Sequence, residues 1–155
     1  MKHEISVTVN GRTHRLTVES QRTLLELLRD DLKLFGVRES CGASVCGACT
    51  VLVNGLPVSS CTSLAARANG AAITTVEGLA VDGRLHPLQQ AFLEHGAFQC
   101  SYCTPGMLLT AMTLLRENPN PTVEEIREYL AGNLCRCGAY PEIVAAVRAV
   151  AKSGP

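Results

Sequence analysis

The placement of eight cysteines in 155 residues limits the folds open to this chain more than any other feature of its sequence. The cysteines fall into two groups of four. The first group is Cys41, Cys46, Cys49 and Cys61. The second group is Cys100, Cys103, Cys135 and Cys137. Because no cysteine is left over, the sequence predicts two separate sites, each built from four thiolates.

The first group has the spacing of plant-type [2Fe–2S] ligands, in which three cysteines share one loop and the fourth comes from a later segment. Gly42 and Gly47 lie within that loop. Glycine lets the backbone curl closely around a cluster, so that N–H groups can point at its sulfur atoms. This spacing favours a [2Fe–2S] cluster over a structural zinc ion, which is the main alternative for four thiolates.

The second group is less specific. Cys100 and Cys103 precede an expected helix, and Cys135 and Cys137 fall between two expected helices. The two pairs can therefore meet at one end of a helical unit, where helix N-termini present free N–H groups to an anion. Because two close cysteine pairs also build all-thiolate zinc sites, the spacing alone leaves iron and zinc open here.

Composition excludes several classes of function. The chain has 14 basic and 14 acidic residues and no basic block, which gives no support for nucleic-acid binding. It has no apolar run long enough for a membrane span. The residues after Met1 alternate polar and apolar instead of forming a signal segment. We therefore expect a cytoplasmic location, where cysteines bind metal more often than they form disulfides.

The N-terminal half predicts a small sheet crossed by one helix. Its expected elements are a hairpin at 4–9 and 14–18, a helix at 23–34, a hairpin at 50–58, a short helix at 62–68 and a strand at 72–76. Asn-Gly pairs at 10–11 and 54–55 are strong hairpin signals. This order predicts a β-grasp, ferredoxin-like domain over residues 1–77, with the junction to the next domain at 77–85.

The C-terminal half has no strand signal and predicts an all-α domain over residues 78–155. Its expected helices cover 86–95, 105–116, 122–130 and 141–151. Pro87 and Pro105 stand in the first turn, where proline is tolerated, and Thr122 with Glu125 forms a capping-box pattern. The four helices predict a bundle, and the fold class is therefore α+β.

No motif for substrate chemistry is present. The four histidines are scattered and are read as surface or capping residues, and Met107 and Met112 are expected in the core. The chain shows no phosphate loop, paired carboxylates or nucleophile with a neighbouring base. We therefore expect no catalytic residue on this chain and a role in carrying electrons.

Three motifs resemble the iron–sulfur subunit of the molybdenum hydroxylases, the xanthine oxidase family. They are CGASVCGACTVLV at 41–53, QCSYCTPGM at 99–107 and GNLCRC at 132–137. The family includes aerobic carbon monoxide dehydrogenase, aldehyde oxidoreductases and N-heterocycle hydroxylases. Three motifs in the right order over residues 4–150 make the resemblance specific, and it implies iron at the second group as well.

The resemblance implies a relay of two [2Fe–2S] clusters. A molybdopterin centre on a large partner subunit hydroxylates the substrate, and electrons leave through the C-terminal cluster and then the N-terminal one. Gln99 matches a glutamine that hydrogen-bonds the pterin, and Cys137 matches the ligand nearest to it. The acceptor is implied to be an FAD-containing subunit or another partner.

Two departures from the family pattern bear on geometry and substrate. Ser44 and Val45 stand where glycine is frequent, which affects the fine geometry of the first loop. Ser101 and the stretch 138–141 resemble the aldehyde and N-heterocycle branches, so the resemblance favours those substrates over carbon monoxide. A stand-alone two-cluster ferredoxin and a structural zinc protein are the alternatives to a subunit of a larger complex.

Overall fold

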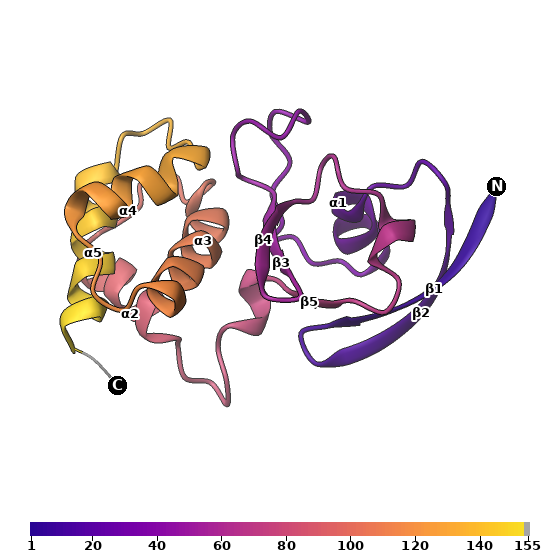
Figure 1. The fold of residues 1–155 in the computed structure, drawn as a ribbon, viewed down its shortest axis with the longest axis horizontal. Coiled ribbons are helices and arrows are strands. Elements are labelled where there is room, and N and C mark those ends of the chain that lie inside the picture. The colour runs from indigo at the N-terminus through magenta and orange to yellow at the C-terminus, as the bar shows by residue number, and fades with distance from the viewer. Residues whose placement is uncertain (154–155) are drawn as a thin grey trace.

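Residues 1–153 are described in a computed structural model of the chain, which places a sheet-containing half beside a helical half (Figure 1). The expected second domain ends at residue 155, and its last two residues lie outside the described part. The mixed α+β fold expected from the sequence is confirmed.

The N-terminal half is built on a five-stranded sheet of order β2-β1-β5-β3-β4. The strands are β1 (Lys2–Val9), β2 (Arg12–Glu19), β3 (Thr50–Val53), β4 (Leu56–Ser59) and β5 (Ala72–Thr74). Both expected hairpins form, because β1 pairs with β2 and β3 pairs with β4 in antiparallel register. The last strand, β5, lies parallel to β1 and antiparallel to β3, so it joins the two hairpins into one sheet.

The helix expected at 23–34 is shorter and less regular than the apolar pattern indicated. It consists of α1 (Leu24–Glu26) followed by a π-helical turn, η1 (Leu27–Asp31). The N–H of Leu32 donates to the carbonyl of Leu27, five residues back, over 3.1 Å. Lys33 then takes a left-handed conformation with φ of 58°, which ends the helix before residue 34.

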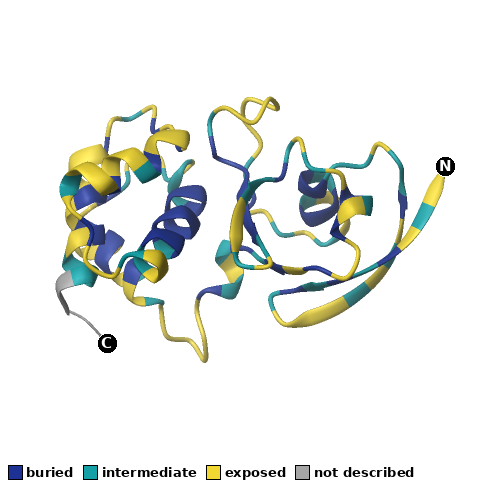
Figure 2. Cartoon of the chain, viewed as in Figure 1, coloured by how far each residue is buried: buried dark blue, intermediate teal, exposed yellow. Residues whose placement is uncertain are grey.

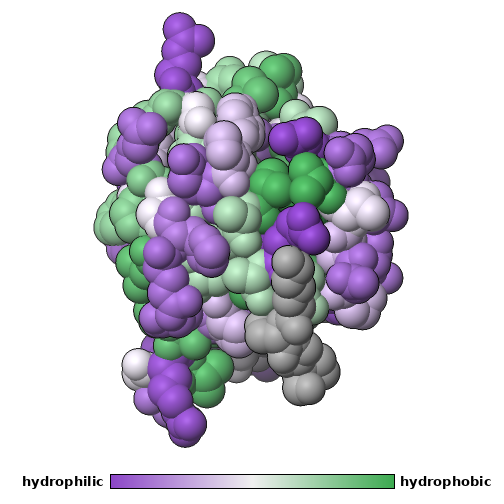
Figure 3. Space-filling view, turned by 90° about the vertical axis from the view of Figure 1, so that its left-hand side faces the viewer, coloured by the Kyte–Doolittle hydropathy of each residue, from purple (hydrophilic) through white to green (hydrophobic). Residues whose placement is uncertain are grey.

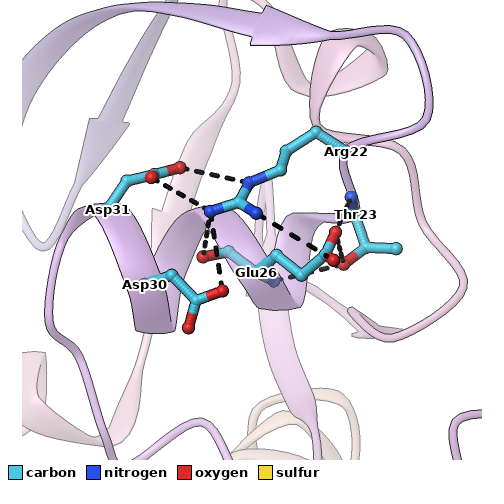
Figure 4. A network of polar contacts seen from close by, with 5 residues as sticks. All are labelled: Arg22, Thr23, Glu26, Asp30 and Asp31. Atoms are coloured by element: carbon cyan, nitrogen blue, oxygen red, sulfur yellow. Dashed lines mark hydrogen bonds and ion pairs between the residues drawn. The ribbon is translucent and has the colours of Figure 1, made fainter.

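Figure 4 shows how Arg22 holds this helix in place. Its guanidinium reaches Asp31 over 3.0 Å, Asp30 over 3.5 Å and Glu26 over 4.0 Å. The carboxylate of Glu26 accepts from the Thr23 backbone N–H over 2.7 Å and completes a capping box with that threonine. The Arg22 side chain thus contacts carboxylates in both the first and the last turn of this helical segment.

The C-terminal half contains α2 (Pro87–Glu94), α3 (Thr104–Glu117), α4 (Val123–Tyr129) and α5 (Tyr140–Ser153). Shorter 3-10 turns are η2 (Ala65–Ala68) in the N-terminal half, where a short helix was expected, η3 (Val76–Gly78) between the halves, and η4 (Leu130–Gly132) after α4. His86 caps α2 and Thr122 caps α4, each through a capping box. All four expected helices are confirmed, within a few residues at their ends.

Two apolar cores meet at strand β3. Val51 is fully buried in the core between the sheet and α1, together with Leu24 and Ile73. The next residue, Leu52, points the opposite way and belongs to the core of the helical half with Phe92. Figure 2 shows the buried residues concentrated on the facing sides of the elements in both halves.

The surface of the helical end carries apolar groups as small patches separated by hydrophilic ones (Figure 3). Among the described residues, no helix combines the length and apolar character needed to cross a membrane.

Candidate metal centres

The first cysteine group lies in the loop that precedes β3. Cys49 stands directly before this strand, and the β3–β4 hairpin returns the chain so that Cys61 lies beside it. The thiol of Cys61 donates a hydrogen bond to Cys49, and the thiol of Cys46 donates to Cys41. The fold therefore gathers all four cysteines of the first group as two pairs, and we call this arrangement site 1.

The Cys41 sulfur is surrounded by backbone donors. The N–H groups of Ala43 and Val45 point at it over 3.4 Å each, and that of Cys46 over 3.5 Å. These hydrogen bonds, led by the one from Ala43, lower the pKa of Cys41 to about 6. The loop is thus built to stabilise a negatively charged sulfur.

The loop achieves this curl through left-handed backbone conformations. Gly42 has φ of 64° and Gly47 has φ of 71°, as expected for glycine. Ser44 has φ of 60° although it carries a side chain, and its N–H donates to Cys61. Burial is the larger influence on that thiol and raises the pKa of Cys61 to about 11.

The second group lies at one end of the helical half. Cys103 is the N-cap residue of α3, while Cys135 and Cys137 lie between η4 and α5. The thiol of Cys137 donates to that of Cys100 over 3.5 Å, and the thiol of Cys103 donates to Cys135. The second group is thus also gathered as two pairs, which we call site 2.

Backbone donors also surround site 2. Burial acts to raise the pKa of Cys135, but hydrogen bonds from the N–H of Ala139, the thiol of Cys103 and the N–H groups of Cys137 and Gly138 outweigh it, and the pKa is lowered. The bond from Ala139 spans 3.4 Å. For Cys103, burial dominates and raises the pKa to about 12. The backbone of the loop thus favours negative charge on Cys135 in particular.

Each site has an outer pair of cysteines that includes an exposed residue and an inner pair that includes a buried one. The outer pairs are Cys41 with Cys46 and Cys100 with Cys137, and the inner pairs are Cys49 with Cys61 and Cys103 with Cys135. Cys41 and Cys100, in the outer pairs, are exposed, whereas Cys49 and Cys135, in the inner pairs, are buried. A [2Fe–2S] cluster takes two thiolates at each of two irons, so a pairwise arrangement suits it. Within the described residues, no three His, Cys, Asp or Glu side chains are gathered around a single metal-sized position.

The donor set also fits a sulfur-rich anionic group. Thr104, the residue after Cys103, has a buried hydroxyl with no hydrogen-bond partner in the described part of the chain. Buried polar groups are normally paired, so an unpaired hydroxyl next to a candidate ligand suits an additional acceptor at site 2. Cys103 also stands at the N-cap position of a helix of 14 residues, whose N-terminus favours negative charge.

Gln99 lies next to site 2 at the surface. Its side-chain amide donates to the carbonyl oxygen of Cys137 over 3.1 Å, and the residue is exposed. The structure thus brings together the two residues for which the sequence resemblance implies proximity to a pterin.

The two sites are joined by short contacts that the sequence did not indicate. The carbonyl of Cys46 accepts from the N–H of Leu134 over 2.8 Å, and Leu134 directly precedes Cys135. The buried amide of Asn133 donates to the carbonyl of Gly47 over 3.1 Å. Only the position of these residues inside the GNLCRC motif could have pointed to them.

A third missed residue is Tyr140. Its hydroxyl accepts a hydrogen bond from the N–H of Cys135 over 2.8 Å, so the first residue of α5 fixes the backbone of a candidate ligand. No spacing rule links a tyrosine to a cysteine five positions earlier, and the contact depends on the turn between them.

Comparison with known proteins matches each half to a family. Residues 7–74 match the 2Fe-2S iron-sulfur cluster binding domain, and residues 75–148 match the [2Fe-2S] binding domain. The nicotinate dehydrogenase small FeS subunit of Eubacterium barkeri is 52% identical over 147 residues, covering 95% of this chain and 94% of that protein. This chain is an iron–sulfur subunit of the molybdenum hydroxylase family.

Two further relatives support this membership. The iron-sulfur-binding subunit PaoA of the Escherichia coli K12 aldehyde oxidoreductase is 44% identical over 158 residues, covering 92% of this chain and 69% of that protein. The structure of quinoline 2-oxidoreductase from Pseudomonas putida 86 superimposes with a TM-score of 0.94 and 44% identity, over 98% of this chain and 95% of the other. The iron–sulfur subunit thus has the fold of its family throughout.

In another relative the same unit is part of a longer chain. The aldehyde oxidoreductase of Desulfovibrio desulfuricans superimposes with a TM-score of 0.92 and 40% identity. The match covers 97% of this iron–sulfur subunit but 17% of that chain. Membership of this family makes the chain a component of an oxidoreductase.

Proposed function

We propose that this chain binds two [2Fe–2S] clusters and relays electrons between a molybdopterin centre and an acceptor, both on partner subunits. The ligands of the N-terminal cluster are Cys41, Cys46, Cys49 and Cys61. The ligands of the C-terminal cluster are Cys100, Cys103, Cys135 and Cys137. The pairing of thiols two by two in both sites carries the proposal, because it provides two thiolates for each of two irons.

Bound clusters would supply reversible one-electron chemistry at both sites. The chain's own contribution is to hold the thiolates and to surround them with N–H donors, which tune the potential. It also connects the sites through the hydrogen bond between Cys46 and Leu134, 2.8 Å long, and the peptide bond to Cys135. Such a short link between candidate ligands of different sites supports a relay.

The proposed direction, from site 2 to site 1, is the one that the family resemblance implies, and each site has an exposed cysteine through which a partner could exchange electrons. Gln99 and Cys100 are exposed beside Cys137, so site 2 offers its outer pair to the pterin on a large subunit. Cys41 is exposed at site 1, which offers the exit to a flavin subunit or another acceptor. Relatives are small subunits of oxidoreductases, which supports such partners.

The division into domains belongs to the same proposal. Residues 1–77 form the ferredoxin-like domain and residues 78–155 form a four-helix bundle that holds site 2. Support comes from the separate apolar cores of the two halves and from the four helices α2, α3, α4 and α5.

The substrate is proposed to be an aldehyde or an N-heterocycle in preference to carbon monoxide. Similar chains belong to nicotinate dehydrogenase, nicotine 6-hydroxylase and caffeine dehydrogenase, whose names refer to N-heterocycles. Another belongs to an aldehyde oxidoreductase. With eight free cysteines, a reducing cytoplasmic location is proposed as well.

Purification of the chain from its native host under oxygen-free conditions tests the proposal. We expect a large molybdopterin-containing subunit to co-purify, and an added aldehyde or N-heterocycle to bleach the visible absorption of the iron–sulfur centres. A chain that elutes alone with its iron would instead be a diffusing ferredoxin. A colourless chain that holds zinc would refute the redox role.

A further inference from the structure

Tyr102 forms a further bridge between the two sites. It lies in the segment between Cys100 and Cys103, and its backbone N–H donates to the Cys100 sulfur. Its hydroxyl donates a hydrogen bond to the carbonyl oxygen of Glu39, two residues before Cys41. One residue therefore contacts a candidate ligand of site 2 and the segment that leads into site 1.

The guanidinium of Arg38 lies over the ring of Tyr102. The guanidinium carbon lies 5.5 Å from the ring centroid, which is within the range of a cation–π contact. The Nε of Arg38 is buried and has no hydrogen-bond partner among the described residues, so this nitrogen does not tie the guanidinium to another group. Ring stacking and the hydroxyl bond together fix Tyr102 against residues 38–39.

This bridge does not serve the packing of either core. Tyr102 is 42% exposed, and it belongs to neither apolar cluster. It is preceded by Ser101, which adopts φ of 63°, a conformation that is unfavourable for a residue with a side chain. The strained backbone at Ser101 directs the exposed side chain of Tyr102 to the other half. Such strain is better explained by a role in positioning site 2 than by a contribution to the stability of the fold.

We propose that Tyr102 is a positioning residue for electron transfer, which fixes the spacing and orientation of site 2 relative to site 1. The inference rests on the proposed function, because it requires a cluster in each site. The link between Cys46 and Leu134 anchors the Cys135 side of site 2, and Tyr102 anchors its Cys100 side. With both anchors in place, site 2 is prevented from tilting away from site 1.

The test uses Tyr102→Phe and Tyr102→Leu in the full chain, isolated with its native partners. Phenylalanine keeps the ring under Arg38 and removes the hydroxyl, while leucine removes both contacts. The matched control is Tyr129→Phe, because the Tyr129 hydroxyl donates to Glu117 over 3.0 Å and joins α4 to α3 within the helical half. All three variants lose one tyrosine hydroxyl bond from the same half.

The readouts are iron per chain, the magnetic splitting between the two reduced clusters in low-temperature electron paramagnetic resonance, and the rate of electron transfer between them after pulsed reduction. We expect full iron in every variant. The splitting and the rate should fall in Tyr102→Phe, fall further in Tyr102→Leu, and stay unchanged in Tyr129→Phe.

Unchanged splitting and rate in Tyr102→Leu with full iron would overturn the inference. Loss of site 2 iron in both Tyr102 variants would also overturn it, because the residue would then build the site instead of spacing it. The spectrum of the wild-type protein shows whether the inference alone has failed or the proposed function has failed as well. Two cluster signals in the wild type uphold that function, whereas a single signal refutes the function and the inference together.

Discussion

The side-chain amide of Asn133 donates a hydrogen bond to the carbonyl oxygen of Gly47 over 3.1 Å, across 86 residues of sequence. The first turn of α3 packs against the same carbonyl, because a Cβ added at Gly106 would lie 2.2 Å from it. Three segments that carry candidate ligands therefore meet at Gly47, Gly106 and Asn133. Two of these three residues are glycines, so no side chain keeps the segments apart. The close approach of the two sites depends on this junction.

Gly106→Ala should consequently destabilise the contact between the halves. The added methyl group meets backbone at 2.2 Å, and backbone does not move aside easily, so we expect a loss of about 1–3 kcal/mol in the free energy of unfolding. Denaturant unfolding of the iron-loaded chain measures it. The control is Gly132→Ala, where an added Cβ would meet nothing within 4 Å. Equal stability of the two variants would contradict the close packing of Gly106 against the Gly47 carbonyl.

Cys46→Ser should remove one cluster and leave the other. Cys46 pairs with Cys41 in site 1, and site 2 takes its four thiols from residues 100–137. We expect iron to fall from about four to about two atoms per chain, with the spectrum of site 2 retained. The reciprocal variant Cys135→Ser should keep site 1. If either substitution empties both sites, the assignment of ligands to separate sites is wrong.

Gln99→Ala should weaken coupling to the pterin subunit without loss of iron. Gln99 is exposed, and its side-chain amide donates to the carbonyl oxygen of Cys137 and not to its sulfur. The matched control is Gln90→Ala, which removes an exposed glutamine that hydrogen-bonds Glu94 on α2 over 2.8 Å. Turnover of the isolated complex should fall in the first variant and stay unchanged in the second. Equal turnover in the Gln99→Ala and Gln90→Ala complexes would show that Gln99 makes no functional contact with the pterin subunit.

The capping box of α1 makes stability depend on pH. The backbone N–H of Thr23, followed by its hydroxyl, lowers the pKa of Glu26 below its ordinary value of 4.5. A carboxyl whose pKa is depressed by folding stabilises the fold above its unfolded pKa, and that stability is lost as the pH falls through the folded value. Wild type should therefore exceed Glu26→Gln in stability at pH 7.

Urea unfolding of both proteins at a series of pH values checks this dependence. The difference between wild type and Glu26→Gln should be constant at neutral pH and shrink as the pH falls below about 4.5. A difference that does not change with pH would show that the charge of Glu26 contributes nothing to the box.

The local elements could be predicted from the sequence because their signals are local. Asn10-Gly11 turns the first hairpin, Thr122 caps α4, and Pro105 stands in the first turn of α3, as expected. The gathering of the first cysteine group also followed from its spacing, and that of the second group from its place at the ends of expected helices. The π-helical turn after Glu26 did not, since apolar periodicity does not distinguish it from an α-helix.

The contacts between the sites could not be predicted. The partners Cys46 and Leu134, and likewise Glu39 and Tyr102, are far apart in sequence and meet only when the two halves pack. The left-handed conformation of Ser44 was equally hidden, because serine carries no signal for it. The serine that departs from the family pattern thus keeps the backbone conformation that glycine adopts easily.

Low-temperature electron paramagnetic resonance of the dithionite-reduced native protein, with metal quantified per chain, shows directly whether the chain holds a [2Fe–2S] cluster at each site. We expect two distinct [2Fe–2S] signals and about four irons per chain. One signal with about two irons, or zinc in place of iron at residues 100–137, would contradict this expectation.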